Sequence, residues 1–221
     1  MASSASPAQG SQTPSEKGLY ERWRRTFSSM TGAGLTPEEQ EAEVEGRNHR
    51  TCEQWKAQMM EYSPAVTFML KHLELSGCPV KPSNIECGRC DWTRSGGFMP
   101  EGKIVLCQGR IFNKSHMEHT LTHELVHMYD QCKFKVDWLN LRHHACSEIR
   151  ANSLGGDCKW AREIQRGFLS ISKQHQECVR RRAVLSVKGN PACPDEAAAE
   201  RAVNEVWESC FSDTRPFDEI Y

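Results

Sequence analysis

The chain has 221 residues, of which 38% are hydrophobic and 26% charged, a composition typical of a globular protein with one main core. Its 28 basic and 29 acidic residues give a net charge of −1, so the charge balance does not predict direct binding to nucleic acid. No apolar run approaches the roughly 18 residues needed to span a bilayer. Residues 1–12 lack the basic and apolar regions of a secretory signal. We therefore expect neither a membrane span nor secretion by that route.

Eleven cysteines are many for a chain of this size, and they fit disulfides, a thiolate metal site, or both. The odd number leaves at least one cysteine unpaired within the monomer. Cys87 and Cys90 form a single C-x-x-C unit, and we favour structural disulfides over half of a zinc site because no second unit follows. A cysteine-rich chain without a secretory signal suggests the mitochondrial intermembrane space, which is oxidising but supplied from the cytosol.

The sequence divides into three predicted segments. Residues 1–18 are rich in Ser, Ala, Pro, Gln and Gly and predict a disordered tail. Residues 19–80 predict N-terminal helices, in which Pro37 lies in the first turn of one helix and Gly77 ends another. Residues 81–221 predict the core domain, which finishes in helices that we expect disulfides to link.

The core domain begins with short extended pieces. Those at 84–87, 96–98 and 103–107 predict two or three antiparallel strands, and longer helical patterns follow them. The sequence therefore predicts an α+β fold in which a small antiparallel sheet lies over the first of these helices. A second helix and further helices surround it.

The first of these helices, at 115–132, contains no Pro or Gly and carries an H-E-x-x-H pattern. On a helix, His123 and His127 lie one above the other on the same face, so both rings can reach one tetrahedral Zn²⁺. Glu124 is rotated by about 100°. Its carboxylate then lies beside the metal, where it can take a proton from a water molecule.

A catalytic zinc ion needs a third protein ligand and one open position. Glu148 lies 21 residues after His127, enough for the chain to turn and for a second helix to return a carboxylate to the metal. His144 shares the face of Glu148 and is its main rival as ligand, with His143 and Asp130 behind it. His144 could otherwise orient a ligand or stabilise the transition state. Asp130 could accept the free ring N–H of a ligating histidine.

These residues predict metal-assisted peptide hydrolysis, with Glu124 as the catalytic acid and base. In a zinc peptidase, a strand just ahead of the metal helix can offer its edge to an extended substrate chain. Ile104, Val105 and Leu106 are the candidates for this substrate strand.

Several motifs occur in a fixed order around the H-E-x-x-H pattern. They are HELVHMYD at 123–130, DW at 137–138, HACSEIRA at 144–151 and GDC at 156–158. Together they closely resemble the mitochondrial inner-membrane peptidases that process and help assemble the ATP synthase. The resemblance extends from about Cys52 to the end of the chain. Animal members of this group are also described as binding partners of the Ku antigen.

This resemblance implies a zinc metallopeptidase core at 81–221, located in the intermembrane space and attached peripherally to the inner membrane. Its cysteines would be oxidised during import. The implied substrate is a protein or peptide, specifically an ATP synthase membrane subunit, and the implied partners are assembly factors. Two other functions remain open: a non-catalytic assembly chaperone, and a nuclear Ku-binding factor in double-strand break repair.

Overall fold

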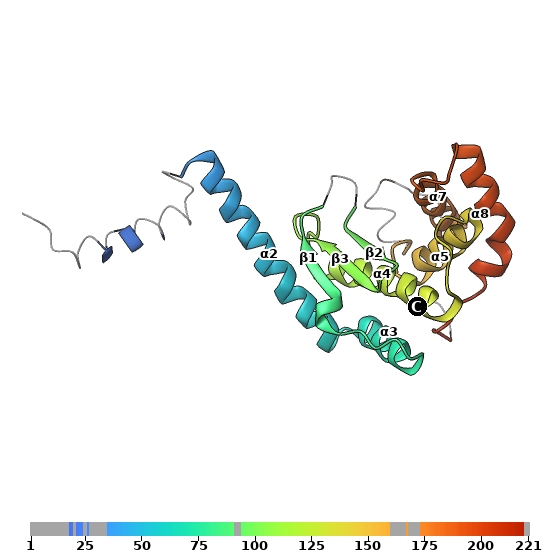
Figure 1. The fold of residues 1–221 in the computed structure, drawn as a ribbon, viewed down its shortest axis with the longest axis horizontal. Coiled ribbons are helices and arrows are strands. Elements are labelled where there is room, and N and C mark those ends of the chain that lie inside the picture. Colours follow the sequence, from blue (N-terminus) through green and yellow to red (C-terminus); the bar gives the residue numbers. More distant parts are fainter. Residues whose placement is uncertain are drawn as a thin grey trace, which may run out of the picture. The chain divides into compact units, whose positions relative to one another are not determined.

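The computed structural model describes residues 18–19, 21–23, 26, 35–90, 94–159, 167 and 173–218. The predicted tail at 1–18 lies outside these residues apart from Gly18. The chain forms two compact units, at 1–47 and 48–221. Its elements follow in the order α2 (Pro37–Tyr62), α3 (Pro64–Leu75), the 3-10 turn η1 (Pro82–Asn84), β1 (Ile85–Gly88), β2 (Gly96–Met99), β3 (Lys103–Cys107), α4 (Lys114–Phe134), α5 (Leu141–Leu154), α7 (Gln174–Lys188) and α8 (Glu196–Phe211) (Figure 1).

Side-chain caps define where the helices begin. Thr36 and Glu39 exchange hydrogen bonds with each other's backbone at the start of α2, which forms a capping box. The side chains of Ser63 and Asn113 accept backbone N–H groups at the starts of α3 and α4. In the described part of the chain, no helix is both long and apolar enough to cross a bilayer.

The three strands form a mixed sheet in the order β1-β3-β2. β2 and β3 are antiparallel, as predicted, but β1 runs parallel to β3, so the prediction of a purely antiparallel sheet was wrong for that pair. The reason is that β2 lies in the connection between β1 and β3, and this connection is long enough to let the chain return in the same direction. The α+β class itself is confirmed.

The sheet order also overturns the predicted substrate strand. β3 is the central strand and pairs with β1 on one side and β2 on the other, so it has no free edge. The candidates Ile104, Val105 and Leu106 therefore cannot receive an added strand. Ile104 and Leu106 are fully buried and instead contribute to the core.

One hydrophobic core lies where α3 and α4 pack together with the strands. Its largest members are fully buried, and each contributes about 1.5–3 kcal/mol by leaving water. They are Met69, Leu73, Ile85, Ile104, Leu106, Met117, Leu121 and Leu125. α4 thus has one face fixed in the core, and its histidines lie elsewhere on the helix.

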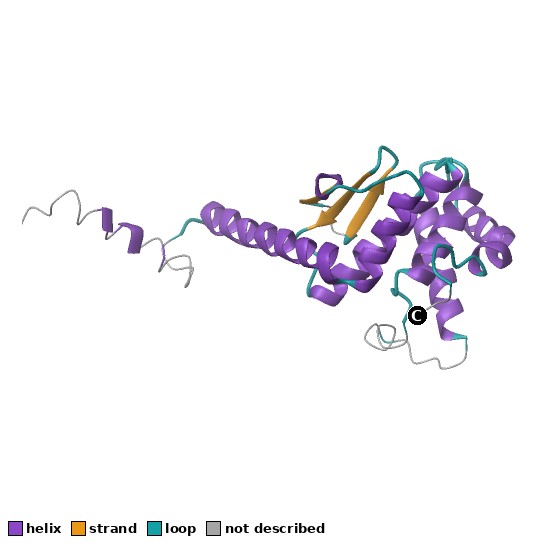
Figure 2. Ribbon diagram, turned by 90° about the horizontal axis from the view of Figure 1, so that it is seen from below, coloured by secondary structure: helices purple, strands orange, loops and turns teal. Residues whose placement is uncertain are grey.

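A second core holds the C-terminal helices α5, α7 and α8 together. It contains Ala145, Ile149, Val179, Ala183, Val203 and Trp207. α5 packs on both α7 and α8 and also on α4, so it joins the two cores. Figure 2 shows the three strands as one group, apart from the C-terminal helices.

Ten of the eleven cysteines form disulfides, which confirms the structural interpretation of the C-x-x-C unit. Cys193 is free. The expected link between the C-terminal helices has a different form, because α8 is tied to α5 and α7 is tied to the segment after α5. The pairs are Cys52–Cys87, Cys78–Cys132, Cys90–Cys107, Cys146–Cys210 and Cys158–Cys178.

Candidate active site

The H-E-x-x-H residues lie on α4, on the helix that the sequence predicted. The Nε2 atoms of His123 and His127 are 3.1 Å apart, and their rings meet edge to face. The next helix approaches closely here: a Cβ added to Gly155, at the end of α5, would lie 3.1 Å from the Cα of His123. The absence of a side chain at Gly155 therefore lets the end of α5 pack directly against the metal helix.

α5 brings Glu148 to the two histidines. Its Oε2 lies 3.8 Å from Nε2 of His123, and its Oε1 lies 3.5 Å from Nε2 of His127. One donor atom from each of the three residues lies within 4.8 Å of the others. The structure thus places the predicted ligands together. His144 lies beside them, with Nε2 3.5 Å from Oε1 of Glu148.

The donor set fits a catalytic zinc ion. Zinc–nitrogen bonds of 2.0–2.1 Å place tetrahedral ligands about 3.3 Å apart, close to the separations found here. Two imidazoles and one carboxylate leave a fourth position open. Ca²⁺ and Mg²⁺ would instead call for ligands that are mostly oxygen.

The charge around the histidines also fits a cation. Burial opposes a charge on His123, but the neighbouring carboxylates of Asp157, Glu124 and Glu148 outweigh it and raise the pKa of His123 to about 9. Oδ2 of Asp157 lies 3.4 Å from Nδ1 of His123. Three carboxylates therefore favour a positive charge at the point where the two histidine rings meet.

Glu148 is held by groups from two helices. Ser186 of α7 donates to Oε1 at 2.6 Å, and Asn152 donates to Oε2 at 3.1 Å. Arg182 in turn donates from Nε to the side-chain amide oxygen of Asn152 at 2.6 Å. Burial alone would raise the pKa of Glu148, but His127 and the other histidines hold it well below its usual value. Glu148 is thus ionised and fixed in orientation.

His127 is oriented by a buried chain of hydrogen bonds. Its Nδ1–H donates to Ser147 Oγ at 2.8 Å, and Ser147 donates to Asp130 Oδ2 at 2.9 Å. This arrangement leaves Nε2 of His127 without a hydrogen and available to a metal. The prediction that Asp130 accepts the ring N–H of a ligating histidine directly was wrong. The hydroxyl group of Ser147 lies between the Asp130 carboxylate and the ring of His127.

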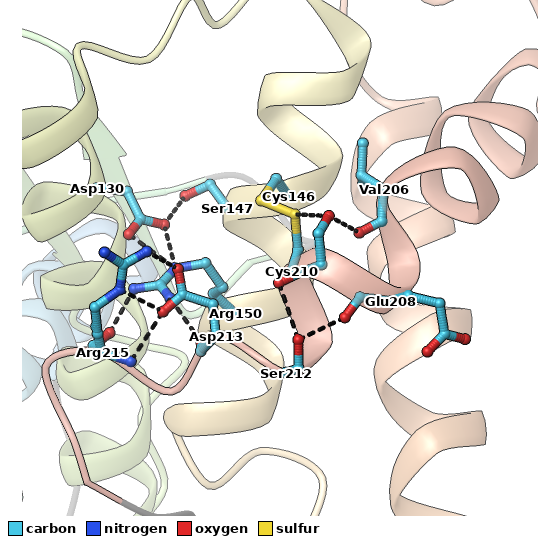
Figure 3. Close-up of a disulfide and its surroundings, with 11 residues drawn as sticks. Asp130, Cys146, Ser147, Arg150, Val206, Glu208, Cys210, Ser212, Asp213 and Arg215 are labelled. Atoms are coloured by element: carbon cyan, nitrogen blue, oxygen red, sulfur yellow. Dashed lines mark hydrogen bonds and ion pairs between the residues drawn. A yellow bond between two sulfur atoms is a disulfide. The ribbon is translucent and has the colours of Figure 1, made fainter.

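Asp130 is anchored to the C-terminal segment through Arg150, whose side chain is 2% exposed (Figure 3). Arg150 Nε donates to Asp130 Oδ1 at 3.0 Å. Its other nitrogens bind the Asp213 carboxylate at 2.7 Å, the Asp213 carbonyl at 2.6 Å and the Arg215 carbonyl. The ring of His127 is therefore connected to residues 213–215 by continuous polar contacts.

Glu124 lies beside the candidate metal ligands and against β2. A Cβ on Gly96 would lie 2.8 Å from Thr120 Cγ2 and 3.2 Å from Glu124 Oε1, so only glycine lets the strand approach this closely. Burial raises the pKa of Glu124, which is typical of a catalytic carboxyl group. A cleft of about 940 Å³ opens here between β2, α4, α5 and the end of α7.

Sequence reasoning assigned no role to several residues that the structure brings to this site. Asp157 and Ser147 lie inside the GDC and HACSEIRA motifs, which were the only signal for them. Asn152, Ser186 and Arg182 carry no distinguishing pattern. Of the remaining rival ligands, His143 accepts the backbone N–H of Asp137 at 3.2 Å and lies away from the donor cluster.

Comparisons with known proteins point to a single family. The chain is 48% identical to the mitochondrial inner membrane protease ATP23 of Yarrowia lipolytica, over 91% of this chain and 84% of that protein. The protein of the same name from Saccharomyces cerevisiae (strain Lalvin EC1118) is 48% identical, over 91% and 96%. That of Aspergillus fumigatus is 43% identical, over 98% and 99%. No solved structure matches.

Residues 50–218 match the family model described as the Peptidase M76 family. This range contains the sheet, the H-E-x-x-H helix, Glu148 and all five disulfides. The resemblance inferred from the ordered motifs is thereby confirmed. The chain belongs to the Peptidase M76 family and is a metallopeptidase.

Proposed function

We propose that this chain is a zinc-dependent endopeptidase that uses His123, His127 and Glu148 as metal ligands and Glu124 as general base. The observation that carries the proposal is the meeting of these ligands' donor atoms within 4.8 Å, beside Glu124 and in an open cleft. The chemistry of the donor set favours zinc over harder cations.

The residues divide the chemistry between them. When bound, zinc would supply a Lewis acid that lowers the pKa of water and polarises the scissile carbonyl. Glu124 takes a proton from the attacking water and delivers it to the leaving amine. Asp130 and Ser147 keep Nε2 of His127 free for the metal, and Ser186 and Asn152 hold the Glu148 carboxylate in place.

We propose β2 as the strand that binds the substrate, in place of β3. Among the strands that the structure describes, β2 pairs with β3 alone, and residues 95–98 line the cleft next to Glu124. An extended polypeptide could add to this free edge by backbone hydrogen bonds. A cleft that is partly open to solvent can admit the middle of a chain, which supports an endopeptidase.

The names of the relatives and the disulfides support a proposal for the cellular setting. The relatives are named mitochondrial inner membrane proteases, and five disulfides suit an oxidising compartment. We therefore place the chain in the intermembrane space, peripheral to the inner membrane, acting on an ATP synthase membrane subunit with its assembly factors. The disulfides favour this location over a nuclear role with the Ku antigen.

The test is cleavage by the Glu124→Gln variant. We expect it to retain zinc and to lose roughly 10²–10⁴-fold in kcat, the usual contribution of a general base. Glu205→Gln is the matched control, because Glu205 is exposed on α8 and forms an ion pair with the exposed Arg142, away from the site. Unchanged cleavage by Glu124→Gln would refute the mechanism. ATP synthase assembly that persists in cells carrying this variant would favour the chaperone alternative.

A further inference from the structure

Asn190 is a buried residue in the loop after α7, and its side-chain amide contacts the ring of His144. Its Nδ2 donates to the carbonyl oxygen of Trp138 at 2.7 Å, and its Oδ1 accepts the backbone N–H of Ala192 at 2.9 Å. A carbonyl can only accept a hydrogen bond, and a backbone N–H can only donate one. These two contacts therefore fix which end of the Asn190 amide faces which neighbour.

The second hydrogen of the same nitrogen points at His144. Nδ2 of Asn190 lies 2.8 Å from Nδ1 of His144. Because an amide nitrogen only donates, Nδ1 must be the acceptor and carries no hydrogen. The ring hydrogen of His144 is consequently on Nε2, the nitrogen that faces Glu148.

The Nε2–H group of His144 makes only a long contact with Glu148. The distance of 3.5 Å to Glu148 Oε1 exceeds the 2.7–3.2 Å of a good N–H···O bond. The same oxygen already accepts from Ser186 at 2.6 Å. His144 lines the cleft, so an oxygen bound there could replace this long contact with a shorter hydrogen bond from Nε2–H.

Trp138 packs against the rings of both His144 and His127. Its indole meets the ring of His127 at 5.7 Å and that of His144 at 5.9 Å, edge to face in both cases. The indole is itself fixed by a 2.8 Å bond from Nε1 to Gln131. Asn190 and Trp138 thus determine both the tautomer and the plane of the His144 ring.

We propose that Asn190 is a positioning residue that keeps the hydrogen of His144 on Nε2, so that His144 donates a hydrogen bond to the oxygen of the scissile carbonyl. The inference rests on the proposed peptidase function and deepens it. As water attacks, this oxygen gains negative charge, and the Nε2–H donor stabilises that charge without transferring its proton. His144 is then a catalytic residue alongside Glu124, and Asn190 acts through it.

The first test reads the tautomer in the resting protein. In full-length, zinc-loaded protein with ¹⁵N-labelled histidine, long-range ¹H–¹⁵N spectra should show the His144 hydrogen on Nε2. Asn190→Ala should convert this signal to a mixture of tautomers, whereas the matched Asn204→Ala on α8 should leave it unchanged. A hydrogen on Nδ1 in the wild type would overturn the inference.

The second test is a double-mutant cycle on an internally quenched peptide that the wild type cleaves. His144→Leu should lower kcat by roughly 10²–10³-fold, the usual cost of losing one such donor, with KM and zinc content unchanged. Asn190→Ala should lower kcat by roughly tenfold or more in the wild type but not in the His144→Leu background.

The cycle separates the two proposals. Equal losses from Asn190→Ala in both backgrounds would mean that Asn190 only anchors its loop, and the inference would fall while the peptidase function stands. Absence of cleavage by zinc-loaded wild type would instead refute the proposed function, and the inference with it. A normal kcat in Asn190→Ala would overturn the inference alone.

Discussion

The site residues on α4 and those on the C-terminal helices are brought together in different ways. On α4, His123 and His127 are brought together by helical spacing alone, because residues four apart share a face. On α5, Glu148 is placed by packing: its helix contacts α4, α7 and α8, and its carboxylate is held by Ser186 from α7. The comparison teaches that half of this site is encoded locally and half depends on the tertiary structure of the C-terminal helices.

We expect the largest loss of stability from breaking the buried hydrogen-bond chain between Asp130 and Arg150, where the two regions meet. Arg150→Met would leave Asp130 as an unpaired buried charge, and breaking a buried pair in this way costs about 3–5 kcal/mol. We expect that loss in the free energy of unfolding by urea, together with weaker zinc binding. Arg142→Met, which removes an exposed pair with Glu205, should cost about 0–1 kcal/mol. Equal losses from the two variants would contradict the role given to Arg150.

Disulfides offer a matched comparison of the two regions. Cys146–Cys210 joins α5 to α8 across 64 residues, and Cys78–Cys132 ties the segment after α3 to α4 across 54. Because loop-closure entropy depends only weakly on length, replacing either pair with alanines should cost a similar 2–4 kcal/mol or so. Only the loss of Cys146–Cys210 should also weaken zinc affinity, because Glu148 is placed by the packing of α5, whereas His123 and His127 keep their spacing within α4 when Cys78–Cys132 is lost. Zinc affinities are measured by competition with a chelator. Equal affinities in the two variants would contradict the claim that the position of Glu148 depends on the packing of the C-terminal helices.

Ser147→Ala should give a smaller and more specific effect. It removes the group between His127 and Asp130 while leaving the packing of α5 largely intact. Groups that orient a metal ligand typically contribute 10–100-fold to metal affinity, or about 1.4–2.7 kcal/mol. Ser209→Ala, on the exposed face of α8, is the control and should leave zinc affinity unchanged. An unchanged affinity in Ser147→Ala would show that the ring of His127 needs no such partner.

The sequence was sufficient for features whose geometry is local. The H-E-x-x-H spacing predicted the position of His123, Glu124 and His127 on one helix, and the distance to Glu148 allowed a second helix to return. The parallel pairing of β1 with β3 could not be predicted, because short strands carry no signal for direction.

The supporting residues were also beyond the reach of sequence patterns. Asn190 lies 46 positions from His144, and Ser186 lies 38 positions from Glu148. Contacts of this kind arise when α7 packs on α5, and no periodicity relates the two residues. The insertion of Ser147 between Asp130 and His127 likewise depends on the exact approach of α5 to α4.

The most direct test of the central claim is the zinc content of purified protein, measured by elemental mass spectrometry. Wild type, His123→Ala and Glu148→Ala should be compared with Glu205→Ala as a surface control. If the two regions form one metal site, wild type and control will hold one zinc ion, and both site variants will lose it. If Glu148→Ala keeps its zinc, or wild type binds none, the account of a site built jointly by α4 and α5 is contradicted.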